Sequence, residues 1–397
     1  MMMTVLLIVI FISFIGVGLP DSILGTAWPS IYREFDLPVS LAGYITATVS
    51  ACTIISSLLS AKVISRFGTG MVTAVSTTLT VVALFGFAFT GSAIFFFVMA
   101  IPLGLGAGSI DTALNNFVAL HYSATKMNFL HCFYGLGIAA SPYIMSYALG
   151  NENNWRKGYI LVAFIQSVIA LIAIFSLPLW KNVERQEKKA DNDVKVLKLS
   201  ELIKMPAVRL SCYAFFSSCA LELTAGSWSS TYFVNTKGVI PDKAAQITML
   251  FYVGLAFGRF LSGVLAKILS RWQIIGISTG VLLGAIIMFI LPVSIMATSI
   301  ALFFIGLGIG PIFPNLTHLT PENFGRDISQ SVMGVQQASA YIGIMIMPWL
   351  FGTLAQICST KIFPCYLLIM FLVYMITLVM LNRKIKRDAL SKEENKQ

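Results

Sequence analysis

Long apolar segments separated by short polar breaks repeat along the whole chain. Each is about 20 residues or longer, which is the length of helix that crosses the hydrocarbon core of a bilayer. The predicted spans are residues 3–32, 39–64, 71–90, 92–120, 127–149, 158–180, 207–234, 244–269, 272–291, 295–319, 328–355 and 362–381. This pattern predicts an all-α integral membrane protein with twelve transmembrane helices.

Composition excludes a soluble enzyme. The 397 residues are 57% hydrophobic and 11% charged, whereas roughly a quarter of an ordinary soluble domain is charged. A net charge of +10 would suggest nucleic acid in a soluble protein, but here most of the 27 Lys and Arg residues fall in alternate loops and at the C-terminus. The positive-inside rule then predicts that both termini are cytoplasmic. We expect a multi-pass protein of the inner (cytoplasmic) cell membrane with the lipid bilayer, and no nucleic acid, as partner.

The polar segment 181–206 divides the predicted spans into two groups of six. Short fragments recur across this division at a nearly constant offset: Gly104-Leu-Gly-Ala-Gly108, for example, returns as Gly306-Leu-Gly-Ile-Gly310. Repeats of this kind indicate a duplicated six-helix unit. We therefore predict an N-terminal six-helix bundle at 1–180, a cytoplasmic linker at 181–206, a C-terminal six-helix bundle at 207–382 and a cytoplasmic tail at 383–397.

Two pseudo-symmetric bundles of six helices are typical of secondary transporters. Residues 60–68 (SAKVISRFG), between spans two and three, resemble the loop signature of the major facilitator superfamily, with Ser65 in place of the usual aspartate. Within that superfamily the chain is similar to the fucose permease branch of proton-coupled sugar symporters. The matching stretches are GLPDSILGTAWPS, GLGAGSIDTALNNF, NFLHCFYGLGIAASP, LELTAGSWSSTYF and GLGIGPIFPNLTHLTPENFG.

Three carboxylates lie well inside predicted spans, namely Asp21, Asp111 and Glu222, together with Arg259. A charge at that depth is expensive, so such groups usually face a cavity or a partner. Burial also favours the protonated form of a carboxyl group. These acids are therefore candidates for coupling transport to a proton gradient.

Asp111 and Asp21 are the predicted proton-coupling residues. Asp111 lies four residues before Asn115, on the same helix face, so it either couples protonation to hydroxyl binding by the amide or forms an internal packing contact. Asp21 follows Gly18 and Pro20, where we expect the helix to be kinked or locally unwound, and it either binds a proton or caps the broken helix. The resemblance assigns proton binding to Asp21, and both substrate and proton coupling to Asp111, where the sugar permeases have glutamate.

The seventh span carries an acid and an aromatic residue on one side. Glu222, Trp228 and Ser229 fall within a narrow sector of a helical wheel. Such a wall suits a sugar, whose apolar face stacks on a ring, and equally a cation through cation–π contact. Trp228 is also the residue type found in interfacial belts, so that structural role stays open.

Polar residues in both halves complete the predicted substrate site. Asn128 and His131 lie early in span five, and the repeat relates His131 to Gln337, beside Gln336. Asn315 follows Pro314 in span ten and is a further candidate contact. Each of these residues has the alternative of a satisfied packing residue.

The sequence favours transport without a cofactor. It contains no Walker loop, dinucleotide motif or metal-ligand spacing, and an intramembrane aspartyl protease would have no use for the duplication. We expect a monomeric carrier that moves a small hydroxylated solute, in particular a monosaccharide, by proton symport with alternating access. The alternative is proton-antiport export of drugs or metabolites. Sodium coupling, the direction of flux, the particular substrate and a Cys358–Cys365 disulfide stay open.

Overall fold

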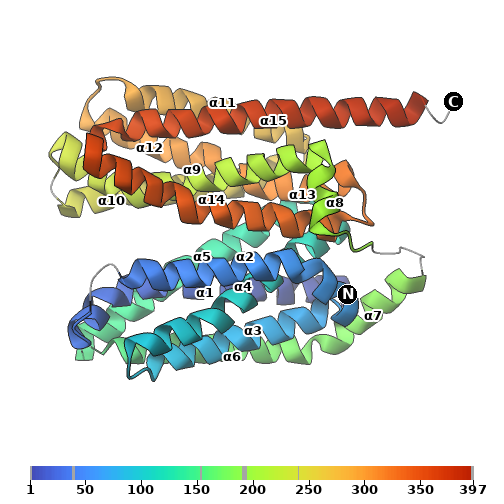
Figure 1. The fold of residues 1–397 in the computed structure, drawn as a ribbon, viewed down its shortest axis with the longest axis horizontal. Helices are drawn as coiled ribbons and strands as arrows, with labels where there is room; N and C mark the ends of the chain where they lie inside the picture. The colour runs from blue at the N-terminus through green and yellow to red at the C-terminus, as the bar shows by residue number, and fades with distance from the viewer. Residues whose placement is uncertain (1, 38–40, 153, 190–194, 240, 395–397) are drawn as a thin grey trace. The chain divides into compact units, whose positions relative to one another are not determined.

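The computed structural model describes residues 2–37, 41–152, 154–189, 195–239 and 241–394, and these residues form helices and no strands. The helices are shown in Figure 1. In chain order they are α1 (Met2–Glu34), α2 (Leu41–Phe67), α3 (Thr69–Ala88), α4 (Ala93–His121), α5 (Ala124–Glu152), α6 (Trp155–Phe175), α7 (Leu177–Lys189), α8 (Leu199–Lys204), α9 (Pro206–Lys237), α10 (Pro241–Leu265), α11 (Arg271–Ile290), α12 (Ile295–Ile309), α13 (Ile312–Phe324), α14 (Ser329–Cys358), the 3₁₀ turn η1 (Thr360–Ile362) and α15 (Phe363–Glu394).

The helices confirm the all-α membrane fold. Among the described residues, 10 helical segments are long and apolar enough to cross a membrane. The predicted spans five and seven correspond to α5 and α9, which have 29 and 32 residues but are more polar because they carry side chains such as His131 and Glu222. With these two, the helices match the twelve predicted spans. The main differences in extent are that span six ends at Phe175, where α7 follows, and that α15 continues to Glu394.

The first helix is not interrupted at the predicted position. Helix α1 continues through Pro20, so the prediction of local unwinding there is wrong. Next to Pro20, Ser141 Oγ of α5 donates to the Leu19 carbonyl at 2.5 Å. The helical break instead separates α12 from α13, at Gly310–Pro311.

The chain is organised as two compact units. Unit 1 comprises Met1–His121, Leu130–Val196 and Arg326–Gly334, and unit 2 comprises Tyr122–Phe129, Leu197–Gly325 and Val335–Gln397. The domain boundaries at residues 180, 206 and 382 stay a prediction.

Equivalent glycines make equivalent helix contacts in the two units. In unit 1, α4 packs against α2, and in unit 2, α12 packs against α10. At each repeated glycine, an added methyl group would collide with a backbone carbonyl of the facing helix. The pairs are Gly104 with Val49, Gly108 with Thr53, Gly306 with Phe251 and Gly310 with Leu255. The sequence repeat is therefore a duplicated close-packing interface, of the small-residue type that membrane helices use.

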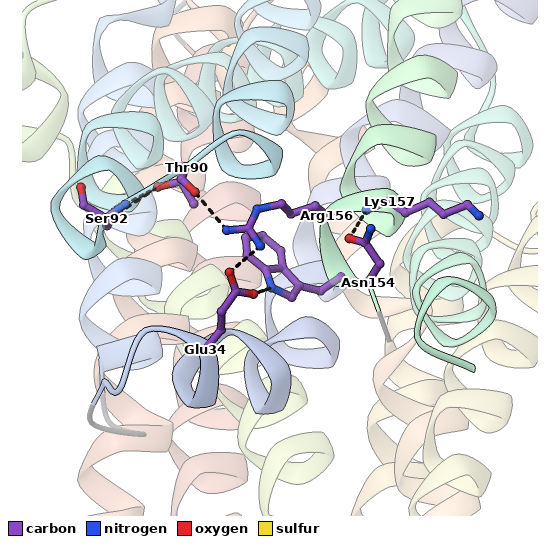
Figure 2. Close-up of polar contacts among 7 residues, drawn as sticks. Glu34, Thr90, Ser92, Asn154, Arg156 and Lys157 are labelled. Atoms are coloured by element: carbon purple, nitrogen blue, oxygen red, sulfur yellow. Dashed lines mark hydrogen bonds and ion pairs between the residues drawn. The ribbon is translucent and has the colours of Figure 1, made fainter. Parts of the chain in front are cut away.

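A polar cluster joins α1, α3 and α6 at the end of unit 1 remote from the N-terminus. Figure 2 shows Glu34 and Arg156 pointing toward one another; the Arg156 guanidinium donates to Glu34 Oε1 at 2.6 Å and to the Thr90 carbonyl at 3.3 Å. The Trp155 indole donates to Glu34 Oε2 at 2.6 Å. Asn154 caps α6 by accepting the Lys157 backbone N–H. Glu34 and Arg156 together thus connect the ends of three helices.

We expect Gly306→Ala to lower the free energy of unfolding by about 1–3 kcal/mol, because the added methyl group overpacks the α10–α12 contact. The control is Gly276→Ala in α11, where an added methyl group meets no atom within 4 Å and alanine is the better helix former. Thermal unfolding of the purified protein in detergent measures both. Equal midpoints for the two variants would contradict the packing role.

We expect Glu34→Ala to lower the free energy of unfolding by about 1–3 kcal/mol, because it leaves the buried Trp155 indole without an acceptor. Glu34→Gln keeps an oxygen acceptor and removes only the half-exposed ion pair with Arg156, which we expect to contribute at most about 1 kcal/mol. The same unfolding measurement separates them. A Gln variant as unstable as the Ala variant would show that the charge, not the indole bond, stabilises the cluster.

Candidate functional site

Asp111, Asn115 and His131 form a buried hydrogen-bonded chain in unit 1. The Asn115 amide nitrogen donates to Asp111 Oδ1 at 2.8 Å, and its amide oxygen lies 3.1 Å from His131 Nε2. All three residues are buried. The edge of the His131 ring contacts Phe14 of α1. The spacing of Asp111 and Asn115 predicts their contact, and the structure adds the histidine from α5.

Asp21 is held by a different residue of α5. Tyr134 donates its hydroxyl to Asp21 Oδ2 at 2.6 Å, while Asp21 itself is an exposed residue of α1. The two helices approach closely because Gly18 faces the Tyr134 carbonyl and Gly137 faces the Ile15 carbonyl, with no room for a side chain at either glycine. Glycine packing therefore sets the position of this carboxylate.

Helix α5 contacts both predicted proton-coupling groups of unit 1, the Asp111 chain and Asp21. His131 and Tyr134 are three residues apart and so project from neighbouring positions on one helix face. Through them, α5 binds the Asp111 group on one side and Asp21 on the other. Sequence reasoning missed Tyr134, although its spacing from His131 was the available signal.

Glu222 in unit 2 is paired with Arg259. The guanidinium donates from its NH2 group to Glu222 Oε1 at 3.1 Å, and the side chains are 8% and 25% exposed for Arg259 and Glu222, respectively. Sequence reasoning identified Arg259 as a charge inside a span but gave it no role. Its depth in α10 was the signal, since an unpaired charge there is costly.

Asn315 is bonded to a residue one helical turn from Arg259 in unit 2. Its amide nitrogen donates to Ser262 Oγ at 2.8 Å and to the Pro311 carbonyl at 2.7 Å. Ser262 follows Arg259 by one turn of α10, so both face the same side of that helix. Among the described residues, no partner is recorded for the Asn315 amide oxygen.

The other predicted amides are buried in unit 2. Gln336 accepts the Thr320 hydroxyl at 2.9 Å and donates to Ser211 at 2.5 Å. Within the described part of the chain, no partner is recorded for the Gln337 amide nitrogen or for the Asn128 amide oxygen. Their roles in substrate binding stay a prediction.

Trp228 does not share an open wall with Ser229. Its indole donates to the Pro348 carbonyl at 2.9 Å and its ring packs edge-on against Phe351. Ser229 is buried and bonds to Thr248. A packing role accounts for these contacts, and the predicted substrate contact of Trp228 remains untested.

Neither a metal centre nor a disulfide is found among the described residues. No group of three or more His, Cys, Asp and Glu side chains there is arranged to hold a metal ion. Cys358 and Cys365 are exposed free thiols. The polar groups described above are carboxyl, amide, imidazole, phenol and guanidinium groups, which make hydrogen bonds with one another.

A helical membrane protein with duplicated units and hydrogen-bonded acids within its spans has the characteristics of a secondary transporter. The family model of the Major Facilitator Superfamily matches residues 6–348. The chain belongs to this superfamily, and it is a transporter and not an enzyme.

Proteins of similar sequence include a yeast protein and a bacterial sugar transporter. Bypass of stop codon protein 6 of Saccharomyces cerevisiae is 25% identical over 90% of this chain and 79% of its own length. The glucose/mannose transporter GlcP of Bacillus subtilis is 24% identical over 85% of each chain.

Solved structures show the same fold at low sequence identity. The fucose:proton symporter FucP of E. coli has a TM-score of 0.74 at 15% identity and covers 94% of this chain and 98% of its own. The human organic anion transporter MFSD10 has a TM-score of 0.75 at 13% identity, with 95% and 99% covered. These likenesses define the fold.

We expect a double-mutant cycle of Asn115→Ala and His131→Ala to give a coupling energy of about 0.5–3 kcal/mol in thermal unfolding, because the two side chains share a buried hydrogen bond. The control cycle pairs Asn115→Ala with Glu34→Gln. Glu34 binds Arg156, which donates to the Thr90 carbonyl just before α4 begins. Asn115 lies about 30 Å along α4 from that end, at a rise of 1.5 Å per residue. The control pair should be additive; additivity in both cycles would contradict the chain.

Proposed function

We propose that this protein moves a small hydroxylated solute, of the monosaccharide class, by proton symport with alternating access. The observation that carries the proposal is the buried chain Asp111–Asn115–His131. It joins a proton-binding group directly to an amide, which is a side chain well suited to hydroxyl groups. Asp21, bound by Tyr134, is the second proton-coupling acid.

Coupling follows from what Asn115 binds in each protonation state. With Asp111 ionised, the Asn115 amide nitrogen donates to the carboxylate. A proton on Asp111 weakens this acceptor, because a neutral carboxyl group makes weaker hydrogen bonds than a carboxylate. The amide is then available to a solute hydroxyl. Proton binding therefore precedes and favours solute binding, which is the order a symporter requires.

The remaining polar residues suit a hydroxylated solute. Asn128, Asn315, Gln336 and Gln337 are amides, which offer both donors and acceptors. Two similar proteins, GlcP and FucP, are named for glucose/mannose and fucose transport. These names support a monosaccharide as the substrate.

Proton-antiport export of drugs or metabolites is the second candidate function. The observation behind it is Glu222, whose side chain is 25% exposed inside unit 2. A carboxylate in a transport path attracts cations, and export carriers take such compounds. Arg259, however, neutralises Glu222, so the pair has little net attraction for a cation. This contact favours symport of a hydroxylated solute.

The proposed setting is the inner cell membrane, with both termini in the cytoplasm. The distribution of Lys and Arg between alternate loops supports this orientation. Because one chain contains both duplicated units, we propose that the monomer is the transporting form.

The test is charge movement in proteoliposomes on rapid addition of hexoses, pentoses and deoxysugars. We expect a saturable current that discriminates epimers, with proton entry as its source. Asp111→Asn should reduce the current to background, because an amide cannot carry the proton. Solute exchange at equal concentrations on both sides needs no net proton movement, so the variant should retain part of it.

The matched control is Asp388→Asn, at a half-exposed carboxyl group near the end of α15 that pairs with Lys384. It should leave the sugar current unchanged. Silence across all sugars, together with a response to organic cations, would refute the symport proposal and favour the export function.

A further inference from the structure

Arg259 is a buried cation with unused hydrogen-bonding capacity. The residue is 6% exposed, and its one recorded hydrogen bond joins the NH2 group to a single oxygen of Glu222. Among the described residues, no partner is recorded for its Nε group. Arginine and a carboxylate often form two parallel bonds, which gives the stronger geometry. The guanidinium therefore retains donors for another acceptor.

The Glu222 carboxylate is open on one side. Its side chain is 25% exposed although α9 is one of the membrane-spanning helices. A charged group facing lipid is costly, and ionisable groups in spans face protein or water-filled space. We infer that water and solutes reach this carboxylate. A purely structural ion pair would have no reason to be accessible.

Further polar groups lie near the pair. Asn315, bound to Ser262 one turn after Arg259, has a buried amide oxygen for which no partner is recorded among the described residues. Tyr252 lies two turns before Arg259 on α10, and a methyl group on Gly226 would be 2.6 Å from its hydroxyl. Gly226 is one turn after Glu222 on α9. Donors and acceptors thus lie on both sides of the charged pair.

We propose that Arg259 binds a carboxylate group of the transported solute, and that Glu222 is the proton-releasable partner that occupies Arg259 when no solute is bound. The solute is then a hydroxylated acid, such as a sugar acid. This inference rests on the proposed function for the hydroxylated part of the solute and adds the recognition of its charged group.

The exchange keeps the charge of the site balanced. A proton adds to the Glu222 carboxylate, and Arg259 stays protonated because its guanidinium does not lose a proton in proteins. The carboxylate of the solute replaces Glu222 as the partner of Arg259. On release, the solute leaves, Glu222 gives up its proton and the original pair forms again. One proton and one carboxylate thus bind together.

The groups that face Glu222 are compatible with this exchange. Arg259 and Tyr252 are the titratable residues of α10 that face it. Helices α12, α13, α14 and α15 also pack against α9, and in their described residues no charged contact to Glu222 is recorded. Acidification therefore acts on the pair itself.

The experiment measures binding of D-glucuronate, D-glucose and adipate to the purified full-length protein in detergent, by calorimetry at several pH values. The first two probes differ in having a carboxylate or a hydroxymethyl group, and adipate has carboxylates but no hydroxyl group. We expect glucuronate to bind more tightly than glucose, and more tightly at lower pH because one proton binds with it. Arg259→Gln should weaken glucuronate binding about 30-fold or more and should weaken glucose binding less.

Two further variants complete the test. One should strengthen glucuronate binding at neutral pH, and the other is a control. Glu222→Gln imitates the protonated acid, so glucuronate should bind at neutral pH as tightly as it binds the unmodified protein in acid. Arg271→Gln removes a similar but exposed pair with Glu322 and should change neither probe. If a single variant fails to fold, the double variant Arg259→Gln/Glu222→Gln, which leaves no unpaired charge, should fold and lack the preference for glucuronate.

The outcomes separate this inference from the proposed function. Glucose binding without any preference for glucuronate, in the unmodified protein and in Glu222→Gln, would overturn the inference and leave hydroxylated-solute transport standing. Binding of adipate that depends on Arg259, without binding of either sugar, would support carboxylate recognition and refute the hydroxylated substrate. Failure of the folded protein to bind any of the three probes would overturn the inference.

Discussion

A polar group inside a bilayer has to find its partner within the protein, because lipid offers none. This constraint governs the arrangement of both units. Asp111 is bound by Asn115 and Asp21 by Tyr134, and Glu222 is neutralised by Arg259. Asp111, Asn115 and His131 form a chain, whereas Asp21 with Tyr134 and Glu222 with Arg259 form pairs.

Close helix packing brings these partners together. The repeated glycines let α4 approach α2 and α12 approach α10, because a glycine leaves room for the backbone of the facing helix. Gly18 and Gly137 do the same for α1 and α5, which brings Tyr134 to Asp21. Small residues are the principal means of close approach between membrane helices, because no hydrophobic force drives helices together in lipid. The positions of these polar groups thus depend on residues without side chains.

The two units use their common fold for different chemistry. In unit 1, Asp111 and Asp21 are bonded through neutral groups, namely an amide, an imidazole and a phenol. Unit 2 places its acid against a guanidinium and surrounds that pair with amide and hydroxyl groups. Duplication preserved the helix packing, while the polar residues diverged. The acids of the two units therefore differ in their partners, which are neutral hydrogen-bonding groups in unit 1 and a cation in unit 2.

Hydrophobic segments of spanning length determined the helices from the sequence alone, because crossing a bilayer fixes both length and composition. The sequence likewise determined the duplication and the Asp111–Asn115 contact, since residues four apart on a helix are neighbours. Tertiary structure decided the rest: that His131 binds Asn115, that Tyr134 binds Asp21 and that Arg259 neutralises Glu222. It also placed the break at Gly310–Pro311 instead of at Pro20. These contacts join different helices, and periodicity within one helix carries no information about which faces of two helices meet.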